Sequence, residues 1–198
     1  MANLFVKAAV GSDIGISRSN NEDNYYLNGK FAIYESDKQT ATAFQSPVTE
    51  GVFAVFDGMG GQSKGEFASL TAAQTLELYK DDIARGNTHK IFDYISDTNN
   101  RICNEMKKNN ERIGSTVAIL TISDGVAQAY NLGDSSIYHL SKRKITKDFC
   151  RLLFAGVFFC FWGKKTDSSN AKASNCPFYI CQIFKYLSVR NSVSVVCE

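Results

Sequence analysis

Acidic residues stand directly beside glycine at the ends of two β-prone runs of the chain. In "GVFAVFDGMGG", Asp57 closes an apolar run and is followed by three glycines. In "NLGDSSIY", Asp134 again follows a glycine. A third acidic position, the adjacent pair Glu22 and Asp23, comes just before another β-prone stretch. Carboxylate oxygens suit hard divalent cations such as Mg²⁺ or Mn²⁺, and glycine lets the backbone and its carbonyls approach a bound ion.

Each of these acids has a plainer interpretation when it is taken alone. Asp57 and Asp134 are residues that a tight turn after a strand uses, and Glu22 and Asp23 are typical of a solvated surface. The three positions together favour the metal interpretation. Zinc is disfavoured, because the chain has two histidines and no C-x-x-C pair, and neither ligand type is near the acids.

Composition narrows the class of protein. The chain of 198 residues carries 22 basic and 20 acidic side chains, a balance that gives no reason to expect a nucleic-acid partner. The N-terminus, "MANLFVKAAVGSD", reads as a first strand and not as a signal peptide, so we expect a cytoplasmic protein. The apolar run "LLFAGVFFCFW" is shorter than the ~20 residues needed to cross a bilayer, so we expect no membrane span.

The elements that must position the acids form a regular α/β pattern up to residue 149. We expect strands over residues 3–11, 25–34 and 114–140, with hairpin turns at Asn28-Gly29 and Asp124-Gly125. The polar residues 35–50 predict a loop.

Two helices are expected between these strands. The first covers residues 65–85 and the second follows Asn87 and Thr88. The first has apolar residues at helical spacing, namely Phe67, Leu70, Ala73, Leu76, Tyr79 and Ile83. The second carries a similar stripe, namely Ile91, Ile95, Thr98, Ile102 and Met106. Both stripes predict core surfaces, and strands with adjacent helices predict a sheet core with helices packed on it.

Four motifs, in order, resemble those of the metal-dependent protein serine/threonine phosphatases of the 2C type, the PPM family. They are "RSNNED", "FAVFDGMGGQSKGEFAS", "GSTVAIL" and "NLGDSSIY", and the resemblance covers roughly residues 4–148. It implies an α+β fold, a four-layer α-β-β-α sandwich of two antiparallel sheets flanked by helix pairs, here incomplete at the C-terminus. It also implies two Mg²⁺ or Mn²⁺ ions at one end of the sandwich and phosphorylated proteins as substrates.

The resemblance assigns the acids. Asp57 matches the aspartate that bridges the two metals, and the Gly58 carbonyl matches a ligand of the first. Glu22 and Asp23 match acids that hold metal-bound waters, and Asp134 matches an aspartate associated with a third, more weakly held ion. One ion is therefore well supported in this chain.

The remaining assignment concerns the phosphate. Arg18 matches the arginine that binds the substrate phosphate, a role suited to its planar, charged fork. The mechanism implied is hydrolysis of phosphoserine or phosphothreonine by a metal-activated water, with Arg18 and Asp57 as the catalytic residues. Met59 stands where many eukaryotic members have a histidine proposed as general acid, so neither histidine of this chain receives that role.

The tail departs from the family pattern. Residues 1–149 read as the N-terminal part of a phosphatase domain, and residues 150–198 as an atypical tail rich in cysteine and phenylalanine. The tail has a single aspartate, Asp167, which does not follow an apolar strand, and Asn191 stands where the last metal aspartate is expected. A truncated or misread gene product and a genuine divergent tail both fit. A catalytically impaired module that binds phosphoproteins or a partner is the alternative function.

These departures predict an incomplete dinuclear site and weak turnover. Of the expected ligands of the second ion, Asp57 is present, and Asn191 offers a neutral oxygen where a carboxylate is expected. The second ion should therefore bind weakly. Calorimetric titration of the purified protein with Mn²⁺ should find at most one tight site. Two tight sites, with turnover comparable to that of an intact family member, would contradict the prediction.

Overall fold

The computed structural model describes residues 6–15, 18–33, 40–60, 64–123, 126–141, 144–147, 153–154 and 192–197.

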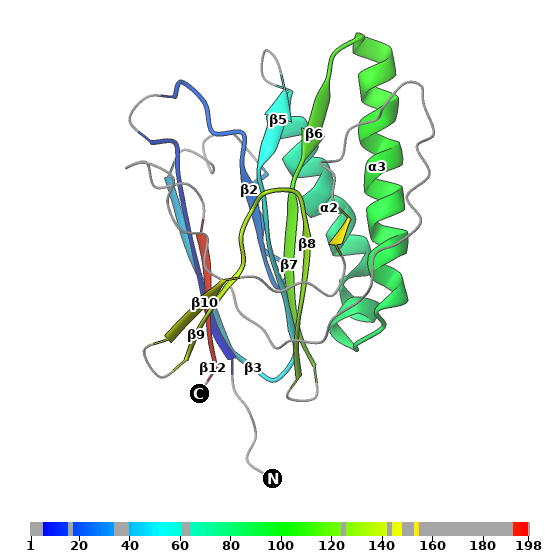
Figure 1. The fold of residues 1–198 in the computed structure, drawn as a ribbon. Helices are drawn as coiled ribbons and strands as arrows, with labels where there is room; N and C mark the ends of the chain where they lie inside the picture. The colour runs from blue at the N-terminus through cyan, green and yellow to red at the C-terminus, as the bar shows by residue number, and fades with distance from the viewer. Residues whose placement is uncertain are drawn as a thin grey trace.

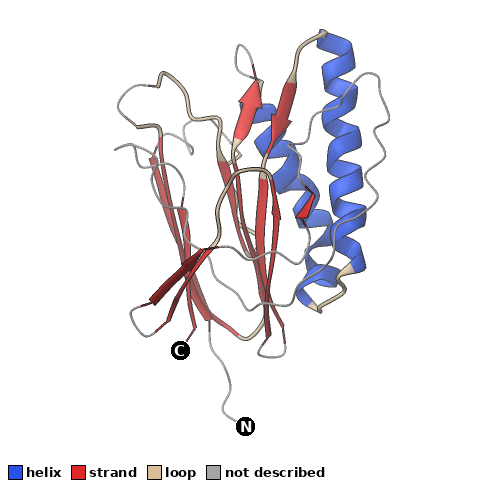
Figure 2. Ribbon diagram, viewed as in Figure 1, coloured by secondary structure: helices blue, strands red, loops and turns tan. Residues whose placement is uncertain are grey.

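Two β-sheets and a helix pair lie in successive layers (Figures 1 and 2). The larger sheet has the order β11-β8-β7-β4-β2, with bounds Leu153–Phe154, Val126–Leu132, Val117–Ser123, Gly51–Phe56 and Asn24–Leu27. The other has the order β12-β1-β3, with bounds Ser192–Cys197, Val6–Asp13 and Thr40–Val48. Helices α2 (Gly65–Ala84) and α3 (His89–Asn109) cover one face of the larger sheet, and the smaller sheet lies against the opposite face.

Two short ribbons complete the fold. β5 (Gly58–Gly60) pairs with β6 (Ile113–Ser115), and β9 (Tyr138–Ser141) pairs with β10 (Lys144–Lys147). The structure thus confirms a mixed α+β fold with antiparallel sheets, except that β11 runs parallel to β8. The second helix pair of the predicted four-layer sandwich lies outside the described residues and stays a prediction, as does the division at residue 149.

The central strand β4 is buried on both faces. Phe53 and Val55 pack between the two sheets, with residues of β1 and β7. Val52, Ala54 and Phe56 point the other way, into the core beneath α2 and α3. A strand covered on both sides needs apolar residues at every position, which explains the unbroken apolar run before Asp57.

Both helices have the predicted ranges, but the buried face of α2 differs from the prediction. α3 buries Ile91, Thr98 and Ile102 as predicted, and Ile95 and Met106 pack partly buried against the core. In α2 the prediction for Phe67 was wrong. Its side chain is 37% exposed, and small residues such as Ala68 and Ala72 occupy the buried face, because α2 packs closely on the sheet.

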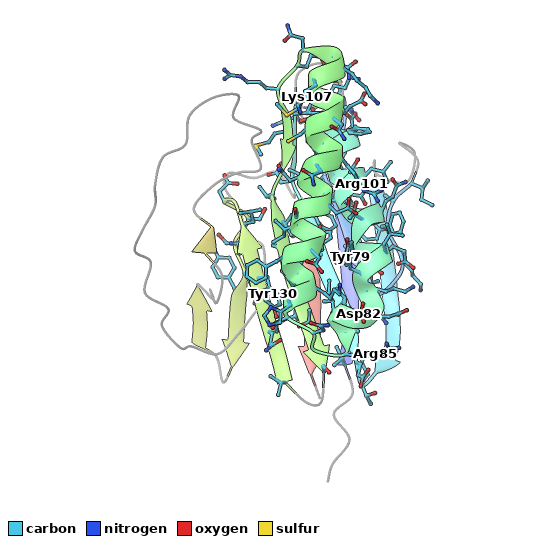
Figure 3. All side chains as sticks on the ribbon, turned by 90° about the vertical axis from the view of Figure 1, so that its right-hand side faces the viewer. Tyr79, Asp82, Arg85, Arg101, Lys107 and Tyr130 are labelled. Atoms are coloured by element: carbon cyan, nitrogen blue, oxygen red, sulfur yellow. The ribbon has the colours of Figure 1, made fainter. Side chains whose placement is uncertain are left out.

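Most exposed residues of the helix layer are polar or charged, although Leu78 and Phe92 are also exposed. Arg101 and Lys107, labelled on α3 in Figure 3, carry exposed side chains. Neither of the two described helices is both long and apolar enough to cross a membrane.

One strand was missed by the sequence analysis. Residues 40–48, predicted as part of a loop, form β3 and pair with β1 along its length. The register shifts between Val6 and Ala8, opposite Ser46 and Pro47, where a bulge tolerates proline. This pairing uses backbone groups from distant parts of the chain, so apolar periodicity gives no signal for it. The predicted turn at Asn28-Gly29 is confirmed, with both residues at positive φ; Asp124-Gly125 lies outside the described residues.

A side-chain network fixes β2 to α2. The Tyr26 hydroxyl donates a hydrogen bond to Glu77, and Lys80 donates to the other oxygen of the same carboxylate. Burial, reinforced by the hydrogen bond to Glu77, raises the pKa of Tyr26 above its ordinary value, so the hydroxyl stays a donor. Because β2 begins directly after Asp23, this contact also holds that acid in place.

Glycines allow three chain segments to cross after β4. A Cβ at position 58 would lie 2.2 Å from the Gly65 carbonyl oxygen and 2.3 Å from the Glu22 carbonyl oxygen. A Cβ at Gly65 would lie 2.7 Å from the Glu22 side chain, and one at Gly60 would lie 2.8 Å from the Gly65 nitrogen. Gly58 and Gly60 are therefore needed for packing, independently of any bound ion.

Replacing Gly58 by alanine should destabilise the fold. The added methyl group meets backbone atoms that no rotamer change can move, and overpacking of this kind costs about 1–3 kcal/mol or more. Urea denaturation should give a clearly lower free energy of unfolding for Gly58→Ala than for the parent.

Gly65→Ala is the matched comparison. The three atoms nearest to its new methyl group all belong to the Glu22 side chain, at 2.7–2.9 Å, whereas the methyl group at position 58 meets two backbone carbonyl oxygens at 2.2 and 2.3 Å. The loss for Gly65→Ala should therefore be smaller. A Gly58→Ala variant as stable as the parent would show that the crossing is not as tight as described.

Candidate active site

The predicted site residues line one cavity of about 360 Å³. Its described lining comprises Asp13, Ile14, Arg18, Asn20, Asn21, Glu22, Asp23, Asp57, Gly58, Met59, Gly60 and Asp134. The structure therefore brings together all six residues that the sequence predicted, although they are spread over more than one hundred positions of the chain.

Antiparallel pairing explains why these residues meet. Asn24, the first residue of β2, pairs with Phe56, the last of β4. The end of β4 also lies beside the start of β7, which pairs with the end of β8 at Leu132. The residues just outside these strand ends, including Asp23, Asp57 and Asp134, consequently gather at one edge of the sheet.

The cavity is strongly acidic. Its lining holds five carboxylate residues, Asp13, Glu22, Asp23, Asp57 and Asp134, against one arginine. Mutual repulsion among these groups is relieved by a bound cation, and an all-oxygen donor set suits Mg²⁺ or Mn²⁺. Among the described residues, however, no three His, Cys, Asp or Glu side chains lie close enough together to form a ready-made metal cluster. The donor chemistry thus fits a hard cation, and the described carboxylates surround a cavity that is wider than a closed coordination shell.

Arg18 lies at the mouth of the cavity. Its side chain is 56% exposed, and its Nη1 atom is 3.8 Å from Oε2 of Glu22. An exposed pair at that distance contributes little to stability, so the guanidinium is able to leave Glu22 for a stronger anion such as a phosphate.

Hydrogen bonds close the base of the loop that carries Arg18. The Asn21 side-chain amide donates to the Ser12 hydroxyl at 3.0 Å in a buried contact. Its side-chain oxygen Oδ1 accepts a hydrogen bond from the Asp23 backbone N–H at 3.1 Å. Asp13 accepts from the Gly15 backbone at 2.7 Å, with Gly15 at φ 76°. Asp13 and Asn21 were not predicted as site residues from the sequence. Asp and Asn two residues before a bonded backbone N–H are the usual signal of such turns.

Met59 lies at the cavity, and His89 lies far from it. Met59 lines the cavity from the β5–β6 ribbon, where it pairs with Gly114. His89 begins α3 at the far end of the helix layer, about 30 Å along α2 from Gly65. His139 has no described side chain, and Asp167 and Asn191 lie outside the described residues.

Comparison with known proteins agrees with this arrangement. The family model described as "Protein phosphatase 2C" matches residues 35–151. The serine/threonine protein phosphatase PstP of Mycobacterium tuberculosis is 26% identical over 147 residues, which is 73% of this chain and 24% of that protein.

Solved structures give the same result. The catalytic domain of PstP in complex with two manganese ions has a TM-score of 0.58 at 25% identity, over 73% of this chain and 55% of that one. The phosphatase Stp1 of Staphylococcus aureus has a TM-score of 0.53 at 22% identity, over 71% of this chain and 51% of that one, and supports the fold alone.

The chain spans about a quarter of the curated relative and about half of the solved domains. The family match covers more than half of the chain and includes three of the four sequence motifs, while the first motif, residues 18–23, lies before the matched range. Glu22, Asp23, Asp57 and Asp134 from these motifs line one cavity. The chain therefore belongs to the protein phosphatase 2C family of serine/threonine phosphatases.

Proposed function

We propose that this chain hydrolyses phosphoserine and phosphothreonine in proteins with the help of bound Mg²⁺ or Mn²⁺. The observation that carries the proposal is the single cavity in which Arg18 faces the carboxylates of four predicted metal residues. Family membership and the two manganese ions named for the PstP catalytic domain support it.

The described residues suggest how a cation would be held. Asp57 and the Gly58 carbonyl would be its direct ligands, Glu22 and Asp23 would hold its waters, and Asp134 would serve a further ion. When bound, such ions lower the pKa of a coordinated water and offset charge on the phosphoryl oxygens.

Arg18 would orient the substrate. Its guanidinium is permanently charged and exposed at the cavity mouth, so a phosphate can bind to its fork without burying an unpaired charge. Glu22, at 3.8 Å, would keep the free arginine near the cavity between substrates.

A phosphoprotein-binding module without turnover is the second candidate. The lack of three converging metal-binding side chains among the described residues favours it. Such a module would still use Arg18, because binding a phosphate needs the cation of the side chain and no activated water.

Activity should depend on a divalent cation. Hydrolysis of p-nitrophenyl phosphate or of a phosphothreonine peptide should require Mn²⁺ or Mg²⁺ and disappear when a chelator is added, because the five lining carboxylates repel a phosphate unless bound cations offset their charge. Undiminished turnover in excess EDTA would overturn the proposed reaction. Absence of turnover at every metal concentration, with phosphopeptide binding retained, would favour the binding module.

Arg18→Ala should lower kcat/KM for a phosphothreonine peptide. A hydrogen bond to a charged group contributes about 1.5–3 kcal/mol, so we expect a loss of roughly ten- to a hundredfold. Arg18→Lys should recover part of it, because lysine keeps the charge and loses the planar fork.

Arg101→Ala is the matched control. Arg101 is similarly exposed and is paired with Asp97 on α3, outside the cavity lining, so its removal should leave kcat/KM near the parent value. An Arg18→Ala variant with the kinetics of this control would exclude the phosphate-binding role.

A further inference from the structure

Asp57 is held through its backbone by one buried residue, Thr116. The Asp57 N–H donates to the Thr116 hydroxyl oxygen at 3.0 Å. In return, the Thr116 N–H donates to the Asp57 carbonyl oxygen at 2.9 Å. Thr116 has no exposed surface and fills the gap between β6 and β7. The residue proposed to bind both metals therefore takes its backbone position from the threonine that joins β6 to β7.

The same hydroxyl group reaches the turn that carries Asp134. The Thr116 Oγ1 and Ser135 Oγ atoms share a hydrogen bond of 2.7 Å, and Ser135 is 3% exposed. Asn131 in turn donates to the Ser135 carbonyl oxygen at 2.5 Å, which fixes the turn to the end of β8. Thr116 thus contacts both Asp57, the residue that follows β4, and Ser135, the residue that follows Asp134.

The methyl group of Thr116 makes a third contact. Gly133 has a φ of +110°, and a Cβ there would lie 2.8 Å from Thr116 Cγ2. Glycine at 133 is required by both its backbone conformation and this close approach. Threonine is therefore suited to position 116 in two respects, since its hydroxyl bonds to residues 57 and 135 while its methyl packs on residue 133.

We propose that Thr116 and Ser135 form a positioning pair that fixes the Asp57 turn relative to the Asp134 turn, so that cation binding at the two carboxylates is coupled. The proposal rests on the proposed metal-dependent function and adds residues that do not themselves touch metal or substrate. Two sites joined by one shared rigid contact influence each other's affinity reciprocally, because displacing either turn moves the common residue. Groups that orient metal ligands from behind typically change metal affinity by 10–100-fold when removed.

The test compares variants that remove one part of Thr116 at a time. Thr116→Val removes the hydroxyl and keeps a similar volume, and Thr116→Ser keeps the hydroxyl and removes the methyl. Ser135→Ala breaks the link between the turns while leaving both Asp57–Thr116 bonds in place. Thr121→Val is the matched control, because Thr121 is also buried on β7 and its hydroxyl makes a 3.5 Å contact with the Gln128 carbonyl, away from the cavity lining.

Two measurements decide the outcome. Calorimetric titration should give a Mn²⁺ Kd that is roughly tenfold or more above the parent value in Thr116→Val and Ser135→Ala. The Kd should equal the parent value in Thr121→Val and lie close to it in Thr116→Ser, which keeps the hydroxyl. Amide hydrogen exchange without metal should show faster exchange at Asp57 in Ser135→Ala, although that substitution is on the other turn.

Each failure has its own signature. If the parent binds no Mn²⁺, the proposed function fails, while faster Asp57 exchange in Ser135→Ala would still support the positioning pair. If Ser135→Ala leaves both the Mn²⁺ affinity and Asp57 exchange at parent values, the pair is overturned. The same conclusion follows if Thr116→Val changes the melting temperature as Thr121→Val does, with no effect on Mn²⁺ affinity. Should Thr116→Val fail to fold, Ser135→Ala alone decides.

Discussion

Burial of β4 on both faces is the constraint on which the rest of the structure depends. The strand separates two cores, one between the sheets and one beneath the helices, and both need its alternating side chains. A strand in this position cannot carry a charge until it leaves the sheet. Asp57 is the first residue after it, so the charged group appears where the apolar layers end and the cavity begins. The same packing therefore stabilises the sandwich and decides where the acidic site lies.

The crossing of glycines next to this strand links the fold to the site in a second way. Gly58 packs against backbone atoms of Glu22 and Gly65, so the loop before β2, the ribbon after β4 and the start of α2 are in direct contact. Farther from the cavity, the hydrogen bond between Tyr26 and Glu77 fixes β2 to α2. Glu22 and Asp23, which precede β2, are therefore supported by two contacts. One is the packing of Gly58 against Glu22 and Gly65, and the other is the hydrogen bond from the Tyr26 hydroxyl to Glu77.

Local patterns in the sequence predicted much of this arrangement. The helical ranges and the turn at Asn28-Gly29 follow from periodicity and turn chemistry. The gathering of the six site residues was implied by the resemblance of four ordered motifs to the protein phosphatase 2C family. β3 was not predictable in that way, because its pairing with β1 depends on backbone bonds across some thirty residues. Phe67 was assigned to the wrong face, since spacing alone does not show that small alanines allow the helix to approach the sheet. Thr116 and Ser135 were missed for a related reason, because a hydrogen bond between polar residues 19 positions apart leaves no periodic trace.

The antiparallel pairings also have a consequence for folding. The cavity acids come from chain segments near residues 22, 57 and 134, and they meet when β2, β4, β7 and β8 are all paired. Contacts of such large sequence separation form late and slowly, after the loop-closure entropy has been overcome. A cation that needs this cavity has no equivalent site in a partly folded chain. Binding should therefore stabilise the native state by mass action and slow its unfolding, with little influence on how fast the chain first folds.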